Sequence, residues 1–395
     1  MKNISIILTV FVLFLTFISC QNESKKANDP VDEKVQNLLN QMTLEEKLGQ
    51  LVQTNYWGEP GNWKEQLVNG KIGSFLNLSG VEHANELQRI ALEESRLGIP
   101  LLIGRDVIHG FKTIFPIPLG MASAWSPEYA EGAMAIAARE ASAYGINWTF
   151  APMIDVTWDP RWGRIAETSG EDPYLTSVLG AAMVKGFQGE DPTEDGRIAA
   201  CAKHFVGYGM SEAGRDYNTT YIPETKLRNI HLRPFKAAAD AGCLTFMSAF
   251  NDLNGVPTSG NYYTLQTILR DEWNYNGMVV SDWASIEQQI IHGYTETPKD
   301  AALSSIVAGV DMEMASRTYD NLGELLAEGK ITEELINERV ANILRVKFKL
   351  GLFDNPYIDE TYQNTRVLTN ESLDYARKVA RGSMVLLKNE KQTLP

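Results

Sequence analysis

The sequence is poor in cysteine and in basic residues, and the common motifs of metal and nucleotide sites are absent from it. Three cysteines in 395 residues exclude a disulfide framework. No CxxC, HExxH, GxGxxG or GxxxxGK(S/T) occurs, so neither a zinc site nor a nucleotide-binding loop is indicated. Lys and Arg number 36 against 50 Asp and Glu, a net charge of −14, which argues against a nucleic-acid partner because such a partner needs a basic face. We expect no metal or organic cofactor, and an uncharged, sugar-like substrate fits this charge balance better.

Length and composition indicate a folded chain with a large core. Of the 395 residues, 22% are charged and 44% are hydrophobic, which excludes a disordered chain and a small disulfide-stapled domain. One α/β barrel takes roughly 250 residues, and more with insertions, so this length allows one domain with additions as well as two or three domains. Cys201 and Cys243 lie in apolar segments and are expected to be buried free thiols, with a bond between them as the alternative.

The N-terminus has the pattern of an export signal. An apolar run from Ile4 to Ile18 follows Lys2 and is about as long as a signal-peptide core, shorter than a typical membrane span. The run ends just before Cys20, and this resembles a bacterial lipoprotein leader in which that cysteine becomes the lipidated first residue. An ordinary signal peptide is the alternative. We expect a signal peptide over 1–19, a polar tether over 20–30, and a protein of the periplasm or outer membrane that contacts the membrane through its lipid.

Short apolar runs alternate with helical patterns along most of the chain. Runs that are apolar throughout and separated by helices predict a parallel sheet covered on both faces. Without nucleotide-binding motifs, this α/β pattern favours a closed, TIM-like (β/α)8 barrel, which need not be regular. The predicted strands are 72–78, 101–104, 148–154, 198–205, 244–250, 278–281 and 307–314, and the helices between them are 81–95, 127–144, 173–187, 224–240, 264–273 and 300–308.

The two ends of this region have patterns of their own. Two helices are expected over 31–42 and 43–54, the second opened by a capping box between Thr43 and Glu46. A long amphipathic helix is expected over 332–350.

A strand-like run over 384–388 lies close to the end of the chain at residue 395. We therefore expect a barrel over 31–370, and a linker with the truncated start of a second α/β sandwich domain over 371–395.

Polar residues follow most of the predicted strands. In a parallel barrel the active site lies at the carboxyl ends of the strands, so these residues are candidates for chemistry. An Asp at such a place can instead cap the next helix, and a Lys-His pair can belong to an ordinary ion-pair network. The residues concerned are Arg105, Asp106, Asp155, Lys203, His204, Met247, Ser248, Ser281, Asp282, Trp283 and Asp311.

Five motifs carry a resemblance to a known family. The sequence resembles the N-terminal barrel domain of the two-domain β-glucosidases of glycoside hydrolase family 3, near the bacterial periplasmic β-glucosidases. Matching segments run almost continuously from residue 31 to 395, and the motifs stand in the order of the family. The motifs are IPLLIGRDVIHGFKTIFPIPLG (99–120), NWTFAPMIDVTWDPRWGRIAETSGEDPYL (147–175), CAKHFVGYGMSEAGRDYN (201–218), MSAFNDLNGVP (247–257) and VVSDWASI (279–286).

The resemblance implies a catalytic nucleophile. A retaining glycosidase needs a carboxylate that attacks the anomeric carbon and a second carboxyl, about 5 Å away, that protonates the leaving oxygen. By resemblance Asp282 is the nucleophile, held at the barrel mouth just after an apolar strand. Trp283 is expected to offer an apolar wall to the sugar, with core packing as the alternative.

The resemblance also implies a sugar pocket of balanced charge. By resemblance Asp106 accepts hydrogen bonds from sugar hydroxyls, and Arg164, Lys203 and His204 donate to others. Met247 is expected to pack beside the sugar ring, with a gap-filling role in the core as the alternative. The charged neighbours of Arg164 are expected to form a local ion-pair and turn network that orients it. These neighbours are Arg161, Glu167, Glu171 and Asp172, and the same structural role is expected for Arg215 and Asp216.

The sequence departs from one branch of the family. Single-domain members, which resemble N-acetylglucosaminidases, carry an acid/base histidine after the Lys-His pair, and residues 207–218 contain none. In two-domain members the acid/base Glu lies on the second domain, so that group is expected outside this chain; Glu313 is the best local substitute.

The function expected is that of an exo-acting retaining β-glucosidase, which removes terminal non-reducing β-D-glucosyl residues from β-linked gluco-oligosaccharides. Poor activity of this chain alone is expected. The alternatives are a catalytically silent sugar-binding protein of the cell surface, or the same enzyme class with β-xylosidase or N-acetylglucosaminidase specificity.

Overall fold

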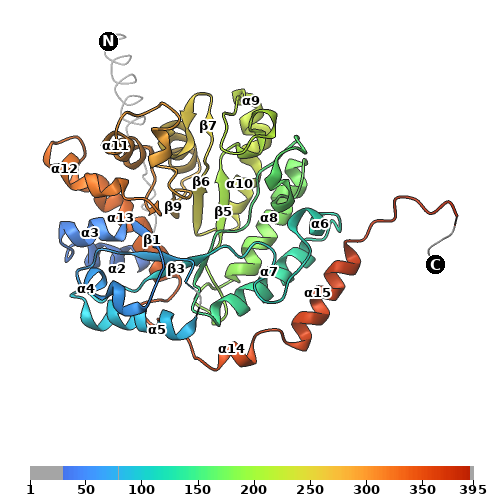
Figure 1. The fold of residues 1–395 in the computed structure, drawn as a ribbon, viewed down its shortest axis with the longest axis horizontal. Coiled ribbons are helices and arrows are strands. Elements are labelled where there is room, and N and C mark those ends of the chain that lie inside the picture. The colour runs from blue at the N-terminus through green and yellow to red at the C-terminus, as the bar shows by residue number, and fades with distance from the viewer. Residues whose placement is uncertain (1–29, 79, 392–395) are drawn as a thin grey trace, which may run out of the picture.

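A computed structural model describes residues 30–78 and 80–391 (Figure 1). The predicted signal peptide, most of the tether, and lipidation at Cys20 lie outside the described residues. Within these ranges, no helix is both long and apolar enough to cross a membrane.

Parallel strands lie in the middle of the molecule, with the helices around them (Figure 1). One sheet has five strands in the order β10-β1-β2-β3-β4, and a second sheet has three in the order β5-β6-β9. The chain is therefore of the α/β class with a parallel half-barrel sheet. The strands are β1 (Val52–Asn55), β2 (Ser74–Leu76), β3 (Leu102–Arg105), β4 (Trp148–Thr149), β5 (Cys201–Phe205), β6 (Thr245–Ser248), β9 (Met278–Val280), β10 (Glu313–Met314) and the antiparallel pair β7 (Asp252–Leu253) and β8 (Val256–Pro257).

Isolated parallel bridges lie between the two sheets. Trp148 of β4 pairs with Ala199, just before β5, and Val280 of β9 pairs with Met312, just before β10. A third bridge joins Met153 to Lys203. On each side of the five-stranded sheet, one such residue pair therefore connects it to the three-stranded sheet.

Helices follow most of the strands and cover the outside of the sheets. The α-helices are α2 (Pro30–Leu39), α3 (Leu44–Gln50), α4 (Lys64–Val68), α5 (Val81–Arg89), α6 (Pro118–Ala122), α7 (Pro127–Ser142), α8 (Pro173–Gln188), α9 (Glu224–Lys226), α10 (Leu232–Asp240), α11 (Pro298–Ala308), α12 (Leu322–Ala327), α13 (Glu333–Lys349), α14 (Tyr362–Thr365) and α15 (Asn370–Gly382). The π-helical segments are η2 (Ile90–Glu94), η6 (Leu227–His231) and η8 (Tyr263–Glu272). The 3-10 helices are η1 (Pro60–Trp63), η3 (Gly163–Glu167), η4 (Tyr208–Met210), η5 (Glu212–Gly214), η7 (Thr258–Gly260), η9 (Glu287–Gln289) and η10 (Thr318–Asn321).

Residues at the starts of α7 and α3 make hydrogen bonds that fix where these helices begin. The Ser126 side chain accepts a hydrogen bond from the backbone N–H of Tyr129 at the start of α7, and Pro127 occupies the first turn, where its missing N–H costs nothing. Thr43 and Glu46 form the predicted capping box at the start of α3.

The predicted helix over 43–54 is too long, because a strand follows it. Helix α3 ends at Gln50 and β1 begins at Val52. Strand β1 pairs with β2 on one side and β10 on the other, so two sets of ladder hydrogen bonds outweigh the weak helical pattern. Gly49 at the end of α3 lies against the backbone of Gly70, where a side chain has no room.

Three further strand predictions need correction. The run over 307–314 forms a strand only at Glu313–Met314, because its first two residues belong to helix α11. The run over 148–154 forms a strand only at Trp148–Thr149, because Pro152 soon interrupts the ladder. The run over 384–388 is not a strand: Met384, Val385 and Leu386 are exposed, and no neighbouring strand pairs with them among the described residues. In Figure 1 this segment extends away from the body of the molecule after α15.

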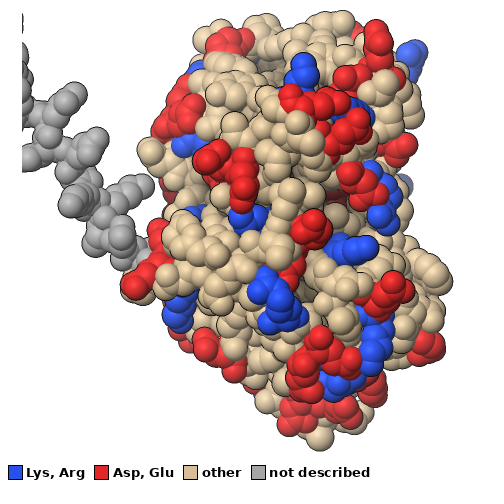
Figure 2. Space-filling model, turned by 90° about the vertical axis from the view of Figure 1, so that its left-hand side faces the viewer, with Lys and Arg blue, Asp and Glu red and all other residues tan. Residues whose placement is uncertain are grey.

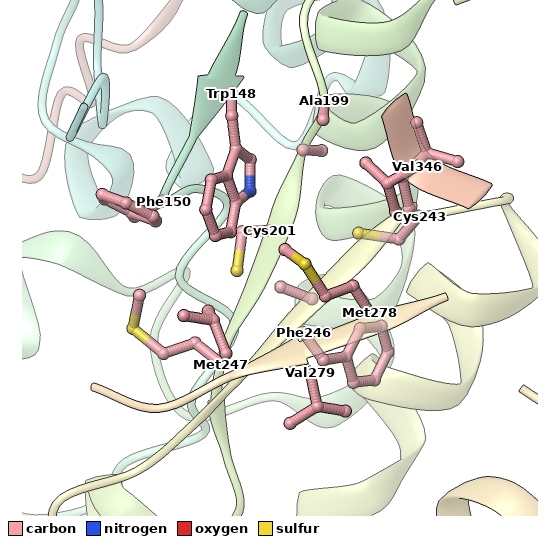
Figure 3. Close-up of a cluster of buried hydrophobic side chains, with 14 of the residues drawn as sticks. Trp148, Phe150, Ala199, Cys201, Cys243, Phe246, Met247, Met278, Val279 and Val346 are labelled. Carbon is pink, nitrogen blue, oxygen red and sulfur yellow. The ribbon is translucent and has the colours of Figure 1, made fainter. Parts of the chain in front are cut away.

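The core lies between the strands and the surrounding helices. Around Cys201 and Cys243, aromatic rings and aliphatic side chains from β4, β5, β6 and β9 pack together (Figure 3). Both cysteines are buried and free, as predicted. The Trp148 indole N–H in this cluster donates to Thr245 Oγ1 at 2.8 Å, which satisfies a buried polar group.

Acidic and basic side chains are mixed on the face of the molecule that Figure 2 shows. The net charge of −14 is therefore not gathered into one patch on this face.

Candidate active site

The structure brings the predicted charged residues to one edge of the sheets. Lys203 and His204 lie near the carboxyl end of strand β5, Asp106 follows β3, and Asp282 follows β9. These strands run parallel, so their carboxyl ends lie at the same edge. Arg164 reaches the cluster from η3.

Lys203 and Asp106 form an ion pair at the margin of the site. Lys203 Nζ lies 2.7 Å from Asp106 Oδ1, with the lysine side chain buried and that of Asp106 53% exposed. Burial lowers the pKa of Lys203, but the nearby carboxylates, Asp106 first, outweigh it and raise the pKa above its usual value. Lys203 is therefore a fixed cation, while Asp106 keeps free acceptor capacity toward solvent.

Asp282 lies deeper in the site. Burial raises its pKa to about 6, against the opposing effects of Lys203, the Trp283 backbone N–H and Arg164. The Trp283 N–H donates to Asp282 Oδ1 at 2.7 Å. Asp282 Oδ2 has no hydrogen-bond partner among the described residues, and it lies 3.4 Å from His204 Nε2. This oxygen is available to a reacting group.

His204 is held from behind by Asp155. Asp155 Oδ2 lies 2.9 Å from the His204 backbone nitrogen and 2.8 Å from Nδ1. Burial, together with the cations Arg164 and Lys203, lowers the pKa of His204 well below its usual value. The imidazole at neutral pH is therefore uncharged.

Arg164 is oriented by a local pair, as predicted. Its Nε and Nη2 atoms donate to the two oxygens of Glu167 at 2.8 and 3.1 Å. Burial lowers the pKa of Arg164, but Glu167 outweighs it and raises the pKa, so the guanidinium stays charged. The guanidinium lies 5.6 Å from the centre of the Tyr208 ring. A bidentate pair and an aromatic face thus fix its direction.

The other charged residues of the same motifs have separate structural roles. Arg161 pairs with Asp159, and the Asp172 side chain caps α8 by accepting from the Leu175 N–H. Asp216 accepts hydrogen bonds from the Tyr208 hydroxyl and from the Trp162 indole N–H. These contacts agree with the structural role expected for Arg161, Asp172 and Asp216.

Trp283 and Met247 differ in their exposure. The Trp283 side chain is 44% exposed beside Asp282, so a ligand can reach it. Met247 is buried and belongs to the core cluster (Figure 3), which matches the alternative given for it.

Glu313 is a structural residue. It is fully buried, and its carboxylate accepts hydrogen bonds from the backbone N–H groups of Thr318 and Tyr319, both at 2.8 Å, and from Ser316. Its oxygens are thus engaged in holding η10, and the idea of a substitute acid at this position is not supported.

The sequence predicts Asp155 only as a candidate at a strand end, without a specific role. Its place after a predicted strand was the only signal, because its partner His204 lies 49 positions further along the chain. A groove of about 470 Å³ lies elsewhere, between α3, η1 and η10, and Asp282 does not line it.

Comparisons with known proteins agree on one family. The model of the glycosyl hydrolase family 3 N-terminal domain matches residues 43–346. The periplasmic β-glucosidase of Salmonella typhimurium is 39% identical over 378 residues, covering 92% of this chain and 49% of that protein. A putative β-xylosidase of Formosa agariphila is 35% identical, covering 96% of this chain and 54% of that protein.

Solved structures agree. The β-glucosidase of Listeria innocua in complex with isofagomine is 40% identical with a TM-score of 0.87, covering 92% of this chain and 52% of that chain. A mutant of the same enzyme in complex with laminaribiose has a TM-score of 0.88. The chain spans about half the length of these relatives. With a matched domain over most of its length and relatives of this identity, the chain belongs to glycosyl hydrolase family 3.

Proposed function

We propose that this chain supplies the nucleophile and sugar pocket of an exo-acting retaining β-glucosidase. The observation that carries the proposal is the free Oδ2 atom of Asp282, buried among Lys203, Arg164 and His204 at the edge where the strands end. Relatives named β-glucosidases support the sugar and the reaction.

The site can perform the first half of a retaining reaction. Two cations, Lys203 and Arg164, favour the ionised form of Asp282, which attacks the anomeric carbon of a terminal glucosyl residue. Asp106 accepts hydrogen bonds from sugar hydroxyls, while the cations and His204 contact others. Trp283 forms an apolar wall.

The general acid of this reaction is proposed to be a Glu of a second domain. Near Asp282, the carboxyl groups of the described residues are otherwise engaged: Asp106 with Lys203, Asp155 with His204, and Glu167 with Arg164. A group that protonates the leaving oxygen has to approach from the open side. Relatives about twice as long as this chain are consistent with this proposal.

We propose that the eight parallel strands complete a (β/α)8 barrel. The single bridges Trp148–Ala199 and Val280–Met312 support closure at both seams. The barrel is proposed to span 31–370. The segment 371–395 is proposed as a linker and the start of the second domain, and the exposed apolar side chains of Met384 and Leu387 support a packing partner there.

Export and anchoring are proposed for the leader. A periplasmic relative supports export, and the position of Cys20 after an apolar run supports a lipid anchor in the periplasm or outer membrane.

An activated aryl glucoside and cellobiose distinguish this proposal from a silent sugar binder. The aryl group leaves without protonation, whereas the leaving glucose of cellobiose needs a general acid. The 395-residue chain is expected to release the aryl group in a burst and to turn over cellobiose very slowly. No aryl release would support a silent binder, and efficient cellobiose hydrolysis by the chain alone would refute the placement of the acid on a second domain.

A β-xylosidase is the second candidate, because a relative at 35% identity is described as a putative β-xylosidase. Glucose differs from xylose by a hydroxymethyl group, so the discriminating residue is an acceptor for that extra hydroxyl. We propose Asp106 for this role, since its carboxylate is half-exposed and only one of its oxygens contacts Lys203.

A further inference from the structure

Asp155 and His204 form a buried pair behind the nucleophile. Asp155 lies between β4 and η3, and both side chains of the pair are 1% exposed. One oxygen of Asp155, Oδ2, meets both the backbone nitrogen and Nδ1 of His204, at 2.9 and 2.8 Å. This oxygen accepts from the backbone N–H, and an ionised carboxylate can only accept, so the hydrogen between Oδ2 and the ring belongs to Nδ1.

The other ring nitrogen is then an acceptor. A neutral imidazole carries one hydrogen, and with that hydrogen on Nδ1 the Nε2 atom has a free lone pair. Nε2 lies 3.4 Å from Asp282 Oδ2, and neither atom has a hydrogen-bond partner among the described residues. Two acceptors that face each other leave a place for a donor from a bound molecule.

We propose that Asp155 is a positioning residue that keeps the proton of His204 on Nδ1, so that Nε2 accepts a hydrogen bond from a substrate hydroxyl beside Asp282. This inference rests on the proposed function. It reverses the direction of the hydrogen bond that the sequence suggests for His204, which was expected to donate to the sugar. A hydroxyl that donates to Nε2 keeps its oxygen free to accept from Lys203 or Arg164.

At neutral and higher pH, the groups around the pair favour a His204 ring with hydrogen on Nδ1 and none on Nε2. The Tyr208 ring packs at 5.1 Å from the imidazole centre and restrains its rotation. Burial raises the pKa of Asp155 to about 7, against the opposing effects of the His204 backbone N–H and Arg164. Below that pH the Asp155 carboxyl takes up the proton and donates it in a hydrogen bond to Nδ1, so the neutral imidazole carries its single hydrogen on Nε2. The ionisable groups around the pair are Lys203 on β5, Arg164 and Glu167 on η3, Tyr208 on η4, Asp106 after β3 and Asp282 after β9.

The position of the proton can be measured directly. In the 395-residue chain labelled with 15N-histidine, NMR at pH 8 is expected to show His204 with hydrogen on Nδ1 and none on Nε2. Comparison with His204→Gln assigns its signals among the five histidines. A hydrogen on Nε2 at pH 8 in the wild-type chain would overturn the proposal.

Two substitutions test whether Asp155 is the cause. Asp155→Leu removes the acceptor, so the proton is expected to move to Nε2, where Asp282 accepts it. Asp155→Asn retains an oxygen for both donors and is expected to keep the proton on Nδ1. Asp216→Asn is the matched control, because Asp216 bonds Tyr208 and not the imidazole, and it should leave the His204 signals unchanged. An unchanged proton position in folded Asp155→Leu would contradict the proposal.

A pH titration keeps the test decisive if Asp155→Leu does not fold. At pH 5.5 wild-type His204 is expected to show a hydrogen on Nε2, and Asp155→Asn is expected to show none, because an amide takes up no proton. Equal behaviour of the two proteins would contradict a role for Asp155. None of these readouts needs turnover, so failure of aryl glucoside cleavage would affect the proposed function without changing this result.

Discussion

Opposite charges are paired around Asp282 so that a buried carboxylate can stay ionised. Burial alone favours its neutral form, and Lys203 and Arg164 oppose that effect. Each cation is held by its own carboxylate, Asp106 or Glu167, which fixes direction and limits the net charge of the site. Asp282 Oδ2, which has no hydrogen-bond partner among the described residues, is therefore surrounded by charged side chains whose positions are fixed.

Asp106 is expected to set the preference for glucose over xylose. Hydrogen bonds to charged groups contribute about 1.5–3 kcal/mol, so Asp106→Ala should lower kcat/KM for an activated aryl glucoside roughly 10- to 100-fold more than for the matching xyloside. Comparing the two substrates within the same variant controls for the unpaired Lys203. Equal losses on both substrates would refute a contact between Asp106 and the extra hydroxyl.

Residues at strand ends were predictable, and residues behind them were not. Asp106, Lys203, His204 and Asp282 each follow an apolar run, and parallel strands bring such positions together. Asp155 has the same local pattern, but its role depends on how β4 and β5 are placed, which no local pattern encodes. Met247 has the same local pattern, but its side chain is buried in the core cluster of Figure 3.

At the scale of elements, long amphipathic helices were predicted well and short strands were not. The expected helix over 332–350 agrees with α13, whose buried residues pack mainly against α2, α3 and β9. Strand β1 has only four residues, Val52–Asn55, and owes its existence to two neighbouring strands. A pattern that short carries little information without its partners.

Helix α13 is joined to α3 and β2 through a buried lysine. Lys347 Nζ donates to Gln50 Oε1 at 2.6 Å and to the Gly73 carbonyl at 3.0 Å. Burial lowers the pKa of Lys347 to about 7, below its value of 10.5 in the unfolded chain. Between these values the unfolded chain binds more protons than the native one, so this lysine makes stability rise with pH from about 7 to 10.5.

Lys347→Met is expected to remove that contribution. The pH slope of the unfolding free energy above pH 7, measured by urea titration, should fall by up to about 1.4 kcal/mol per pH unit. Lys349→Met, a partly exposed lysine of the same helix, is the control and should leave the slope unchanged. An unchanged slope in Lys347→Met would show that this lysine is charged in the native state.

At the scale of the whole molecule, the site is open to solvent at the half-exposed side chains of Asp106 and Trp283. The last described helix, α15, packs against α7, where the Tyr375 hydroxyl donates to the Glu128 carbonyl at 2.8 Å. The following segment exposes Met384, Val385, Leu386 and Leu387. The strand-like run over 384–388 predicts a strand there, but a strand is stable only when it pairs with a neighbouring strand.

Trapping of the glycosyl-enzyme tests the central claim most directly. An activated 2-deoxy-2-fluoroglucoside slows the second half of a retaining reaction, so the sugar stays on the nucleophile. Mass spectrometry of the digested chain is expected to find one fluoroglucosyl group on Asp282, none on Asp282→Asn, and full labelling of Asp374→Asn, an exposed control on α15. A label on another residue, or a label that persists in Asp282→Asn, would contradict the account.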